Sequence, residues 1–595
     1  MTRSTSANET GKARERLWLD PRRGDIEDDA ASPKRRSLFA IAGSLLVEIS
    51  LLKLLFAWTV LLLLPAVLLG LAPLVVSAWF STLSEYVLAL TEIGAAVMLI
   101  AIAALGLIGW RPLLRLAEIN FWSLIALAVQ PSYAFGREAL QHLAELAWRK
   151  DLAPTLRTRL RRASSLGAGI LLSAAAVSVA ILVWPFTQWT AALYELTLLH
   201  LLVKAMLANA TFVVCCYLAA ASLGWGLADA RMDQPVDLAA FDAPASAARV
   251  WRVAHLSDLH VVGERYGFRI ESGRAGPRGN ERLGRVLAQL AAMHAADPFD
   301  HVLITGDMTD AGRASEWAEF LDALFAHPEL VARTVMLPGN HDMNIVDRAN
   351  PARLDLPLSP GKRLRQMRTL SAIAAVQGDR ARPVDASGNI TATLHKALAP
   401  HRGQIADFVQ HGGVRRAVAL RGIFEAQFPM ILPPEEEDGI GIAILDSNAA
   451  THFSFTNALG LISLEQTRRL EAAIGHFPKA AWIIALHHHL VEYPMPVKTF
   501  SERVGTAMIN GSWFVRRAQG FADRAIAMHG HRHVDWIGTC GALRIVSAPS
   551  PVMGVREDAN SHFYIHHLMR GPNGSLCLAE PERVEIAGGK GCAGS

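Results

Sequence analysis

The sequence contains little cysteine, and its cysteines form no pattern typical of a disulfide framework or a zinc site. Only five of the 595 residues are cysteine, with neither paired spacing nor a C-x-x-C motif. This usage predicts structural thiols in a reducing compartment. They are Cys215, Cys216, Cys540, Cys577 and Cys592.

Several common catalytic motifs are also missing. The chain has no G-x-x-x-x-G-K-[ST], no H-E-x-x-H and no G-x-S-x-G, so P-loop, zincin and serine-hydrolase chemistry have no support. A strong charge of one sign is lacking too, because the formal net charge is only +4. Charge alone therefore indicates no particular partner.

Apolar residues, by contrast, are abundant. They make up 51% of the chain, and the mean hydropathy is +0.24, which is too apolar for a purely soluble protein. Most of this excess lies before about residue 230, within a predicted membrane region at 37–230. Four stretches there are long and apolar enough to be transmembrane helices, namely 54–77, 93–110, 166–186 and 205–227. We expect this region to act as an anchor.

Basic residues predict the orientation of these helices. Residues 1–36 are polar, end in Lys34, Arg35 and Arg36, and suggest no cleavable signal peptide. The loop at 111–165 is also basic. The positive-inside bias places both segments in the cytoplasm. We therefore expect a multi-pass protein of the inner (cytoplasmic) membrane, with its C-terminal part in the cytoplasm.

The pattern changes after a linker at 231–250. Short β-type runs near residues 252, 301, 334, 441, 482 and 525 alternate with helical stretches such as ERLGRVLAQLAAMHAA, which predicts an α/β domain over 251–595. Polar residues follow most of these runs. In open α/β sheets a site forms where several strand ends converge. The polar residues are Asp258 and His260, Asp307, Asn340 with His341 and Asp342, His487 with its neighbours, and His531 and His533.

Carboxylate, imidazole and amide groups form a mixed nitrogen and oxygen set that suits divalent first-row metals such as Mn, Fe, Zn or Co. About seven ligands are too many for one tetrahedral ion. They fit two ions, roughly 3.5–4 Å apart, that share a carboxylate.

The order D-x-H, G-D, G-N-H-D, strand-end His and G-H-x-H resembles the signature of the calcineurin-like metallophosphoesterases. The resemblance implies a two-sheet β-sandwich flanked by helices, with a dinuclear metal centre. It implies a first metal held by Asp258, His260, Asp307 and His533. It implies a second held by Asp307, Asn340, His487 and His531, with Asp307 as the bridge and His488 as the alternative to His487. It also implies that His341 protonates the leaving oxygen while Asp342 orients its ring.

AILDSNA and GLISLEQTRRLEAAI further resemble the cyclic-nucleotide and glycerophosphodiester phosphodiesterase branch. Two segments could set specificity. One is the arginine-rich loop at 261–282, where Arg278 is a candidate substrate contact. The other is an insertion at about 349–438, either a cap over the metals or a flexible excursion.

These features together predict a membrane-anchored phosphoesterase that hydrolyses a phosphate ester by attack of metal-bound hydroxide, with a diester as the favoured substrate class. The expected partners are the membrane and a small-molecule or lipid-linked phosphoester, and nucleic acid is not expected. The alternatives are a lipid-linked or nucleotide pyrophosphate hydrolase, a nuclease of the same superfamily, and a non-catalytic metal-binding sensor.

Overall fold

The protein is described by a computed structural model with two compact units, and the described residues divide between them at Met232 and Asp233. The structure describes residues 64–89, 129–148, 154–191, 197–243, 249–264, 279–347, 359–451, 457–495, 508–553, 559–571 and 573–588, with a few single positions between them.

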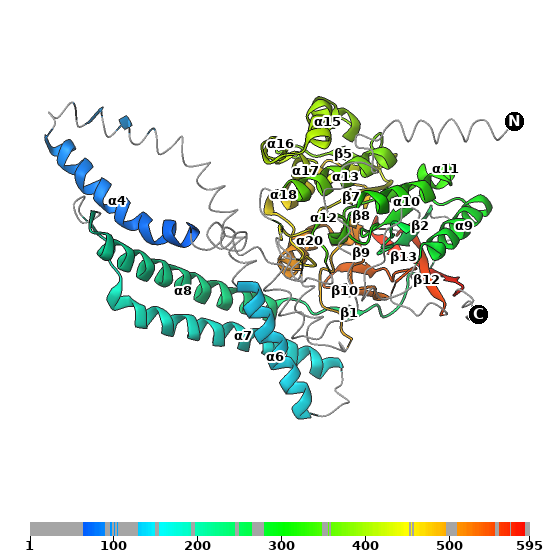
Figure 1. The fold of residues 1–595 in the computed structure, drawn as a ribbon. Coiled ribbons are helices and arrows are strands. Elements are labelled where there is room, and N and C mark those ends of the chain that lie inside the picture. Colours follow the sequence, from blue (N-terminus) through cyan, green and yellow to red (C-terminus); the bar gives the residue numbers. More distant parts are fainter. Residues whose placement is uncertain are drawn as a thin grey trace, which may run out of the picture. The chain divides into compact units, whose positions relative to one another are not determined.

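The N-terminal unit is built from long helices (Figure 1). They are α4 (Leu64–Ala89), α6 (Gln130–Trp148), α7 (Pro154–Val183) with η3 (Trp184–Phe186), and α8 (Leu199–Arg231). Among the described residues, three segments are long and apolar enough to cross a membrane, namely Val67–Glu85, Leu156–Phe186 and Leu199–Arg231.

Three of the four predicted spans overlap these apolar helices. Spans 166–186 and 205–227 lie within the second and third apolar helices, and 54–77 overlaps the first. Span 93–110 lies mostly outside the described residues. The expected basic loop at 111–165 contains α6 and the first turns of α7.

Small residues bring α7 and α8 together. A Cβ on Gly169 would lie 2.7 Å from the carbonyl oxygen of Ser222 and 3.0 Å from Cα of Gly226. A Cβ on Gly226 would lie 2.8 Å from the carbonyl oxygen of Ser165. Small residues four positions apart on each helix allow this close backbone approach, a common feature of helix pairs in membranes.

The C-terminal unit contains two sheets flanked by helices (Figure 1). The eight-stranded sheet has the order β1-β10-β11-β9-β8-β7-β6-β5, and the six-stranded sheet has the order β13-β12-β2-β3-β4 with β14 on β12. The strands are β1 (Val236–Asp237), β2 (Val250–Leu256), β3 (His301–Ile304), β4 (Thr334–Met336), β5 (Arg382–Pro383), β6 (Met430–Leu432), β7 (Ile440–Ile444), β8 (Ala481–Ala485), β9 (Ala525–His529), β10 (Trp536–Cys540), β11 (Leu543–Ser547), β12 (Ser561–Arg570), β13 (Leu576–Leu578) and β14 (Glu582–Ile586).

The helices of this unit are mostly short. They are α9 (Glu281–Ala296), α10 (Ala314–Phe325), α11 (Pro328–Val331), α12 (Asn340–Met343), α13 (Pro360–Gln377), α14 (Leu394–Leu398), η6 (Ala399–His401), α15 (Arg402–His411), α16 (Val414–Ala419), α17 (Ile423–Ala426), α18 (Leu464–Gly475), α20 (Gly511–Ala518) and η8 (Gln519–Arg524). The predicted fold class, apolar N-terminal helices followed by an α/β domain with two sheets, is confirmed.

Much of segment 349–438 belongs to the body of this domain. Leu370 and Ile373 of α13 are buried in the main hydrophobic core, as are Phe424 and Met430 further along. Strands β5 and β6 extend the eight-stranded sheet. This part of the segment therefore packs as core.

Two sets of parallel strands position the candidate site. Strands β2, β3 and β4 run parallel in one sheet, and β7, β8 and β9 run parallel in the other. Each interior is strongly apolar, as typical for parallel strands buried on both faces. The carboxyl ends of five of these strands carry the polar residues that the sequence singled out.

Candidate metal centre

The seven predicted metal ligands lie at the carboxyl ends of β2, β3, β4, β8 and β9. Their side chains approach one another in two groups that share one carboxylate. They are Asp258, His260, Asp307, Asn340, His487, His531 and His533.

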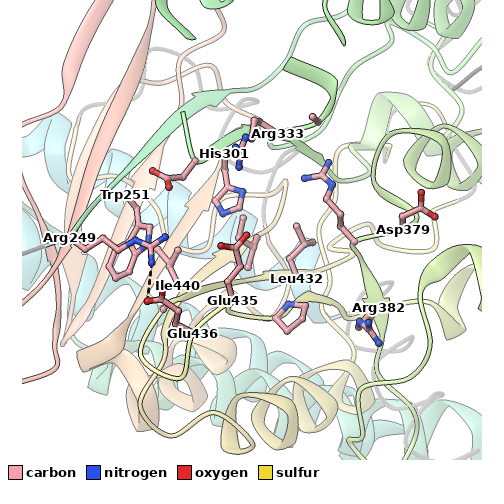
Figure 2. A pocket seen from close by; sticks show the side chains of 16 residues that line it. Arg249, Trp251, His301, Arg333, Asp379, Arg382, Leu432, Glu435, Glu436 and Ile440 are labelled. Carbon is pink, nitrogen blue, oxygen red and sulfur yellow. Dashed lines mark ion pairs between the residues drawn. The ribbon is translucent and has the colours of Figure 1, made fainter. Parts of the chain in front are cut away.

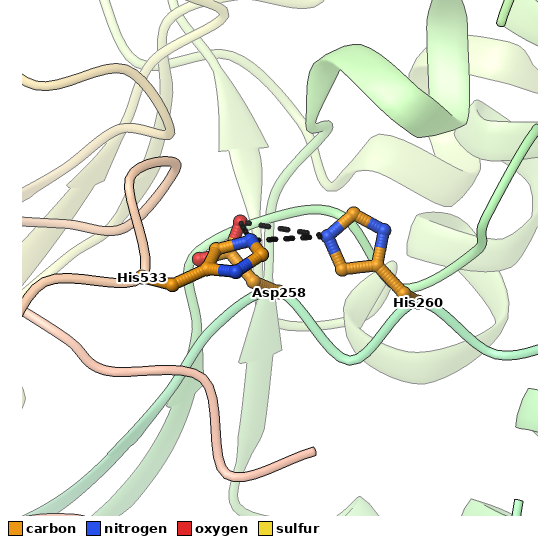
Figure 3. A group of neighbouring side chains, drawn as sticks. All are labelled: Asp258, His260 and His533. Carbon is orange, nitrogen blue, oxygen red and sulfur yellow. Dashed lines mark hydrogen bonds and ion pairs between the residues drawn. The ribbon is translucent and has the colours of Figure 1, made fainter. Parts of the chain in front are cut away.

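The first group surrounds Asp258 (Figure 3). Oδ1 of Asp258 lies 3.4 Å from Nε2 of His533 and 4.0 Å from Nε2 of His260. Nε2 of His260 lies 3.3 Å from Nε2 of His533 and 3.7 Å from Oδ2 of Asp307. Donors about 2.0–2.2 Å from a common ion lie about 3.0–3.5 Å from one another. The spacings are therefore close to those of a slightly expanded ligand shell.

The second group surrounds Asn340. Oδ1 of Asn340 lies 3.0 Å from both Nε2 of His487 and Nδ1 of His531, and these two nitrogens are 3.2 Å apart. Nε2 of His487 lies 3.3 Å from Oδ2 of Asp307. Nδ1 of His487 lies 2.8 Å from the carbonyl oxygen of Thr305. That contact leaves Nε2 as the nitrogen with a free lone pair, as expected of a ligating imidazole.

Oδ2 of Asp307 thus takes part in both groups. The backbone N–H of His341 donates to the other oxygen, Oδ1, over 2.8 Å. This geometry matches the arrangement expected of a bridging carboxylate.

The backbone around these ligands is unusual. In the part of the chain that the structure describes, five non-glycine residues have positive φ, and all five are predicted ligands. Residues other than glycine rarely adopt a positive φ, because it strains the backbone. Such strain is retained where the surrounding fold enforces it. The five are Asp258 (57°), His260 (44°), Asp307 (52°), His531 (77°) and His533 (52°).

Two glycines allow the ligand loops to come this close. A Cβ on Gly339 would lie 2.1 Å from both the backbone nitrogen and Oδ1 of Asp307. A Cβ on Gly530 would lie 1.8 Å from Oγ of Ser257. Only glycine fits at either position without displacing the site.

The electrostatics of the site favour a bound cation. Burial alone would raise the pKa of Asp307, but the imidazoles of His487 and His341 hold it well below its usual range. The pKa of Asp258 is likewise lowered, against its burial, by His533. Two fully buried carboxylates thus remain charged in one site. Buried charges need compensation, and a set of carboxylate, imidazole and amide donors fits divalent first-row metals.

Asp342, which the resemblance assigned to orienting the ring of His341, makes several contacts with the backbone. Its carboxylate accepts hydrogen bonds from the backbone N–H groups of Met308, Thr309 and Gly339 and from the hydroxyl of Thr309. Asp342 therefore ties the β3 and β4 loops together. The ring of His341 is held through Nδ1, which lies 2.7 Å from the carbonyl oxygen of Asp310.

Asp310 is a site residue that the sequence reasoning missed. Its Oδ1 lies 3.5 Å from Nδ1 of His260. Donor atoms of His260, Asp310 and His341 all lie within 4.8 Å of one another. The available signal was a second aspartate three residues after Asp307 in GDMTD.

Neighbouring polar residues support the ligands. Oγ of Ser447 accepts from the backbone N–H groups of His487 and His488 and lies 2.9 Å from Nδ1 of His488. His488 thus pairs with Ser447, whereas His487 faces Asp307. Arg532, between two predicted ligands, forms a 2.8 Å ion pair with Glu492.

Arg278, the predicted substrate contact, lies outside the described residues. Arg282, at the end of the same arginine-rich loop, is buried, and its Nη2 donates to the carbonyl oxygen of Ala559 over 2.9 Å. That arginine therefore supports the fold.

A profile of the calcineurin-like phosphoesterase family matches residues 252–535, which contain every predicted ligand. Residues 252–535 belong to the calcineurin-like phosphoesterase family. The protein therefore carries a metallophosphoesterase domain, a hydrolase of phosphate ester bonds. A search of curated proteins found no match.

Solved structures similar to this phosphoesterase chain include a dimetal phosphatase from Danio rerio, at 11% identity and a TM-score of 0.31. The alignment covers 57% of this chain and 99% of that one. A putative 5'-nucleotidase from Staphylococcus aureus is 11% identical with a TM-score of 0.28, covering 58% and 56%. The NAD nucleotidase of Haemophilus influenzae is 10% identical with a TM-score of 0.29, covering 57% of each. The chain thus spans little more than half of each nucleotidase.

Proposed function

We propose that this protein is a membrane-anchored phosphoesterase that hydrolyses a phosphodiester with two divalent metal ions. The observation that carries this proposal is the position of Asp307, whose Oδ2 is 3.7 Å from Nε2 of His260 in one donor group and 3.3 Å from Nε2 of His487 in the other. Asp258, His260, Asp307 and His533 would hold one ion. Asp307, Asn340, His487 and His531 would hold the second.

The ions, drawn from Mn, Fe, Zn or Co, would supply Lewis acidity toward the phosphate and a nucleophile from water near neutral pH. The residues of the chain would organise the rest. Asp258 and Asp307 stay charged, and the strained ligand loops fix the donors before substrate arrives.

His341 is the proposed proton donor to the leaving oxygen. The Asp310 carbonyl fixes Nδ1 as the protonated nitrogen and leaves Nε2 to exchange a proton with substrate. The ring is only partly buried, so substrate can reach it. A positioned imidazole of this kind typically contributes about 10²–10⁴-fold to the rate.

The diester preference rests on the resemblance of AILDSNA and GLISLEQTRRLEAAI to the cyclic-nucleotide and glycerophosphodiester branch. Hydrogen bonds connect these two segments to each other and to the loop that precedes Asn340. The side-chain amide of Gln466 exchanges two 2.8 Å hydrogen bonds with the backbone N–H and carbonyl of Asp446. Asn448 then donates from Nδ2 to the carbonyl oxygen of Pro338, two residues before Asn340.

The membrane part of the proposal is supported by the three apolar helices. We place the catalytic domain on the cytoplasmic side because the basic residues of 34–36 and 111–165 favour that face. A tethered domain would act on a small or membrane-borne phosphoester.

The test is hydrolysis by the purified full chain in detergent with Mn²⁺. The substrates are phosphomonoesters, cyclic nucleotides, glycerophosphodiesters and nucleotide-linked lipids, and Asp307→Asn is the inactive control. A diester should be the best substrate by kcat/KM. Preference for a monoester would overturn the diester assignment. Preference for a nucleotide-linked lipid would favour a pyrophosphate hydrolase. Equal turnover by Asp307→Asn would reject the site itself.

A further inference from the structure

A cavity is lined by sixteen residues of the C-terminal unit (Figure 2). It lies at the ends of the strands opposite to those that carry the candidate metal centre. Its volume is about 320 Å³, at the small end of ligand pockets. His301 and Ile440, which line it, begin β3 and β7. Asp307 follows His301 by six residues, so on the order of 20 Å separate the two sites at about 3.3 Å per residue.

Three of the four arginines that line this cavity have no carboxylate in ion-pair contact among the described residues, namely Arg333, Arg380 and Arg382. Arg382 reaches the carbonyl oxygen of Thr391 at 3.4 Å, and Arg333 and Arg380 lie beside His301. Nη2 of Arg380 donates to the carbonyl oxygen of Thr334 over 2.6 Å and makes longer contacts with those of Val331 and Val376. All three of these side-chain hydrogen bonds use the same nitrogen, Nη2. Arg333 makes no recorded side-chain hydrogen bond or ion pair in the described part of the chain, and its side chain is exposed.

The two guanidinium groups influence each other and His301. Burial and Arg333 lower the pKa of Arg380 to about 10. Burial, Arg380 and Arg333 lower the pKa of His301 to about 4, so its ring is neutral near pH 7. Nδ1 of His301 is buried and has no hydrogen-bond partner among the described residues. Like charges beside an unsatisfied polar atom are stabilised by a bound anion.

None of the four carboxylates of the cavity forms an ion pair with Arg333 or Arg380 among the described residues, although the charge of Asp379 opposes the lowering of the Arg380 pKa. Glu436 forms a 3.0 Å ion pair with Arg249, drawn as the dashed line in Figure 2. Oδ2 of Asp300 accepts a 2.7 Å hydrogen bond from the backbone N–H of Arg252. Asp379 lies 3.9 Å from Nε2 of His395, and Glu435 is exposed. The negative charge of these carboxylates would repel an extended anion, so the ligand that fits is a compact one.

We propose that this cavity binds a small oxyanion, the phosphate group of inorganic phosphate or of a phosphorylated small molecule, between Arg333 and Arg380 and beside His301. Guanidinium groups present paired N–H donors that match phosphate oxygens. The site is separate from the proposed phosphoesterase centre and does not depend on that function.

The test is isothermal titration of inorganic phosphate into the full chain in detergent, after metals have been removed with an immobilised chelator. Removing the metals keeps phosphate from binding at the other site. We expect binding to the wild type and about a tenfold weaker affinity for Arg333→Ala, as for loss of one charge-assisted contact. Arg333→Lys should lose less affinity for phosphate than Arg333→Ala does. Arg380→Ala is a poor probe because Arg380 also holds three carbonyls.

Arg415→Ala is the matched control, since Arg415 is an exposed arginine on α16, and it should bind phosphate as the wild type does. A second arm uses glycerol phosphate. Tighter binding of inorganic phosphate assigns the free ion, and tighter binding of the monoester assigns a phosphorylated molecule. Failure of both to bind the metal-free wild type overturns the proposal, as does an equal effect of Arg333→Ala and Arg415→Ala.

Discussion

The carbonyl oxygen of Asp310 lies 2.7 Å from Nδ1 of His341. A carbonyl can only accept, so Nδ1 carries a proton and Nε2 is the nitrogen left for chemistry. The contact is made by the main chain and does not require the Asp310 carboxylate. Orientation of the ring therefore follows from the course of the loop after β3.

His341→Ala should keep its metals and lose turnover in a way that depends on the leaving group. An alkoxide leaves poorly without a proton, so a glycerol or sugar diester should be hydrolysed about 10²–10⁴-fold more slowly. A nitrophenolate leaves without a proton, so the loss of kcat/KM on a nitrophenyl diester should be much smaller. The measurement compares kcat/KM on one diester of each kind, with metal content determined on the same samples.

His401→Ala, which removes a partly exposed imidazole on η6, is the matched control and should resemble the wild type. Equal losses on both esters with metal retained would mean that His341 positions substrate or stabilises charge. Loss of metal would instead make His341 a ligand.

Asp307→Asn should lose more metal than Asn340→Ala. Oδ2 of Asp307 belongs to both donor groups, whereas Oδ1 of Asn340 belongs to one. We expect Asp307→Asn to retain few ions of either group, and Asn340→Ala to retain about one ion per chain. Elemental analysis of purified protein measures this stoichiometry. Equal losses would contradict a bridging carboxylate.

A reporter fused after Ser595 tests the predicted orientation. The basic residues of 34–36 and 111–165 predict a cytoplasmic C-terminus. A reporter active only outside the cytoplasm should therefore be silent, and one active only inside should give full signal. The reverse pattern would mean that the number of spans before the catalytic domain is odd.

Asp446→Asn should stabilise the protein at alkaline pH and much less in acid. Burial raises the pKa of Asp446 to about 6, against hydrogen bonds from Asn448. The folded state therefore holds this proton more tightly than the unfolded state, and its stability falls as pH rises from about 4 to 6. Above pH 6 the ionised Asp446 carboxylate lowers the free energy of unfolding by its full amount, about 1–2 kcal/mol after allowance for partial solvent screening.

Thermal unfolding of variant and wild type at pH 8 and pH 4.5 measures this difference. The gain in melting temperature should be larger at pH 8. An equal gain at both values would place the effect in packing and not in ionisation.

The alternation of apolar runs was sufficient to predict the strands that carry the site. Runs near 252, 301, 334, 441, 482 and 525 correspond to β2, β3, β4, β7, β8 and β9, and the predicted helix at 281–296 is α9. Strands β1, β5, β6 and β10 to β14 were not predicted. For β5 and β6 the reason is length, because two or three residues carry no periodicity and are specified by tertiary pairing. Residues 54–63 of the first predicted span and most of the span at 93–110 cannot be compared, since they lie outside the described chain.

The donor residues could be predicted because each follows a strand end, but their supporting contacts could not. The partners of Asp342 and His341 could not be predicted from the adjacency of these residues, because adjacency in sequence is a poor guide inside a tight loop. Asp342 turns toward the backbone of Thr309, and the carbonyl of Asp310 reaches His341. The left-handed backbone at five ligands also has no sequence signal, because aspartate and histidine adopt it only where the fold imposes it.

Strand β2, which leads into Asp258, pairs with β12 near the C-terminus, and His533 follows β9 by four residues. The donor atoms therefore come from almost the whole length of the catalytic domain. A nascent chain or a proteolytic fragment that ends before His531 possesses the Asp258, Asp307 and Asn340 motifs but lacks two imidazoles and the strand that completes the sheet. Full metal uptake should consequently be a late event of synthesis, tied to completion of the polypeptide and not to the emergence of any single motif.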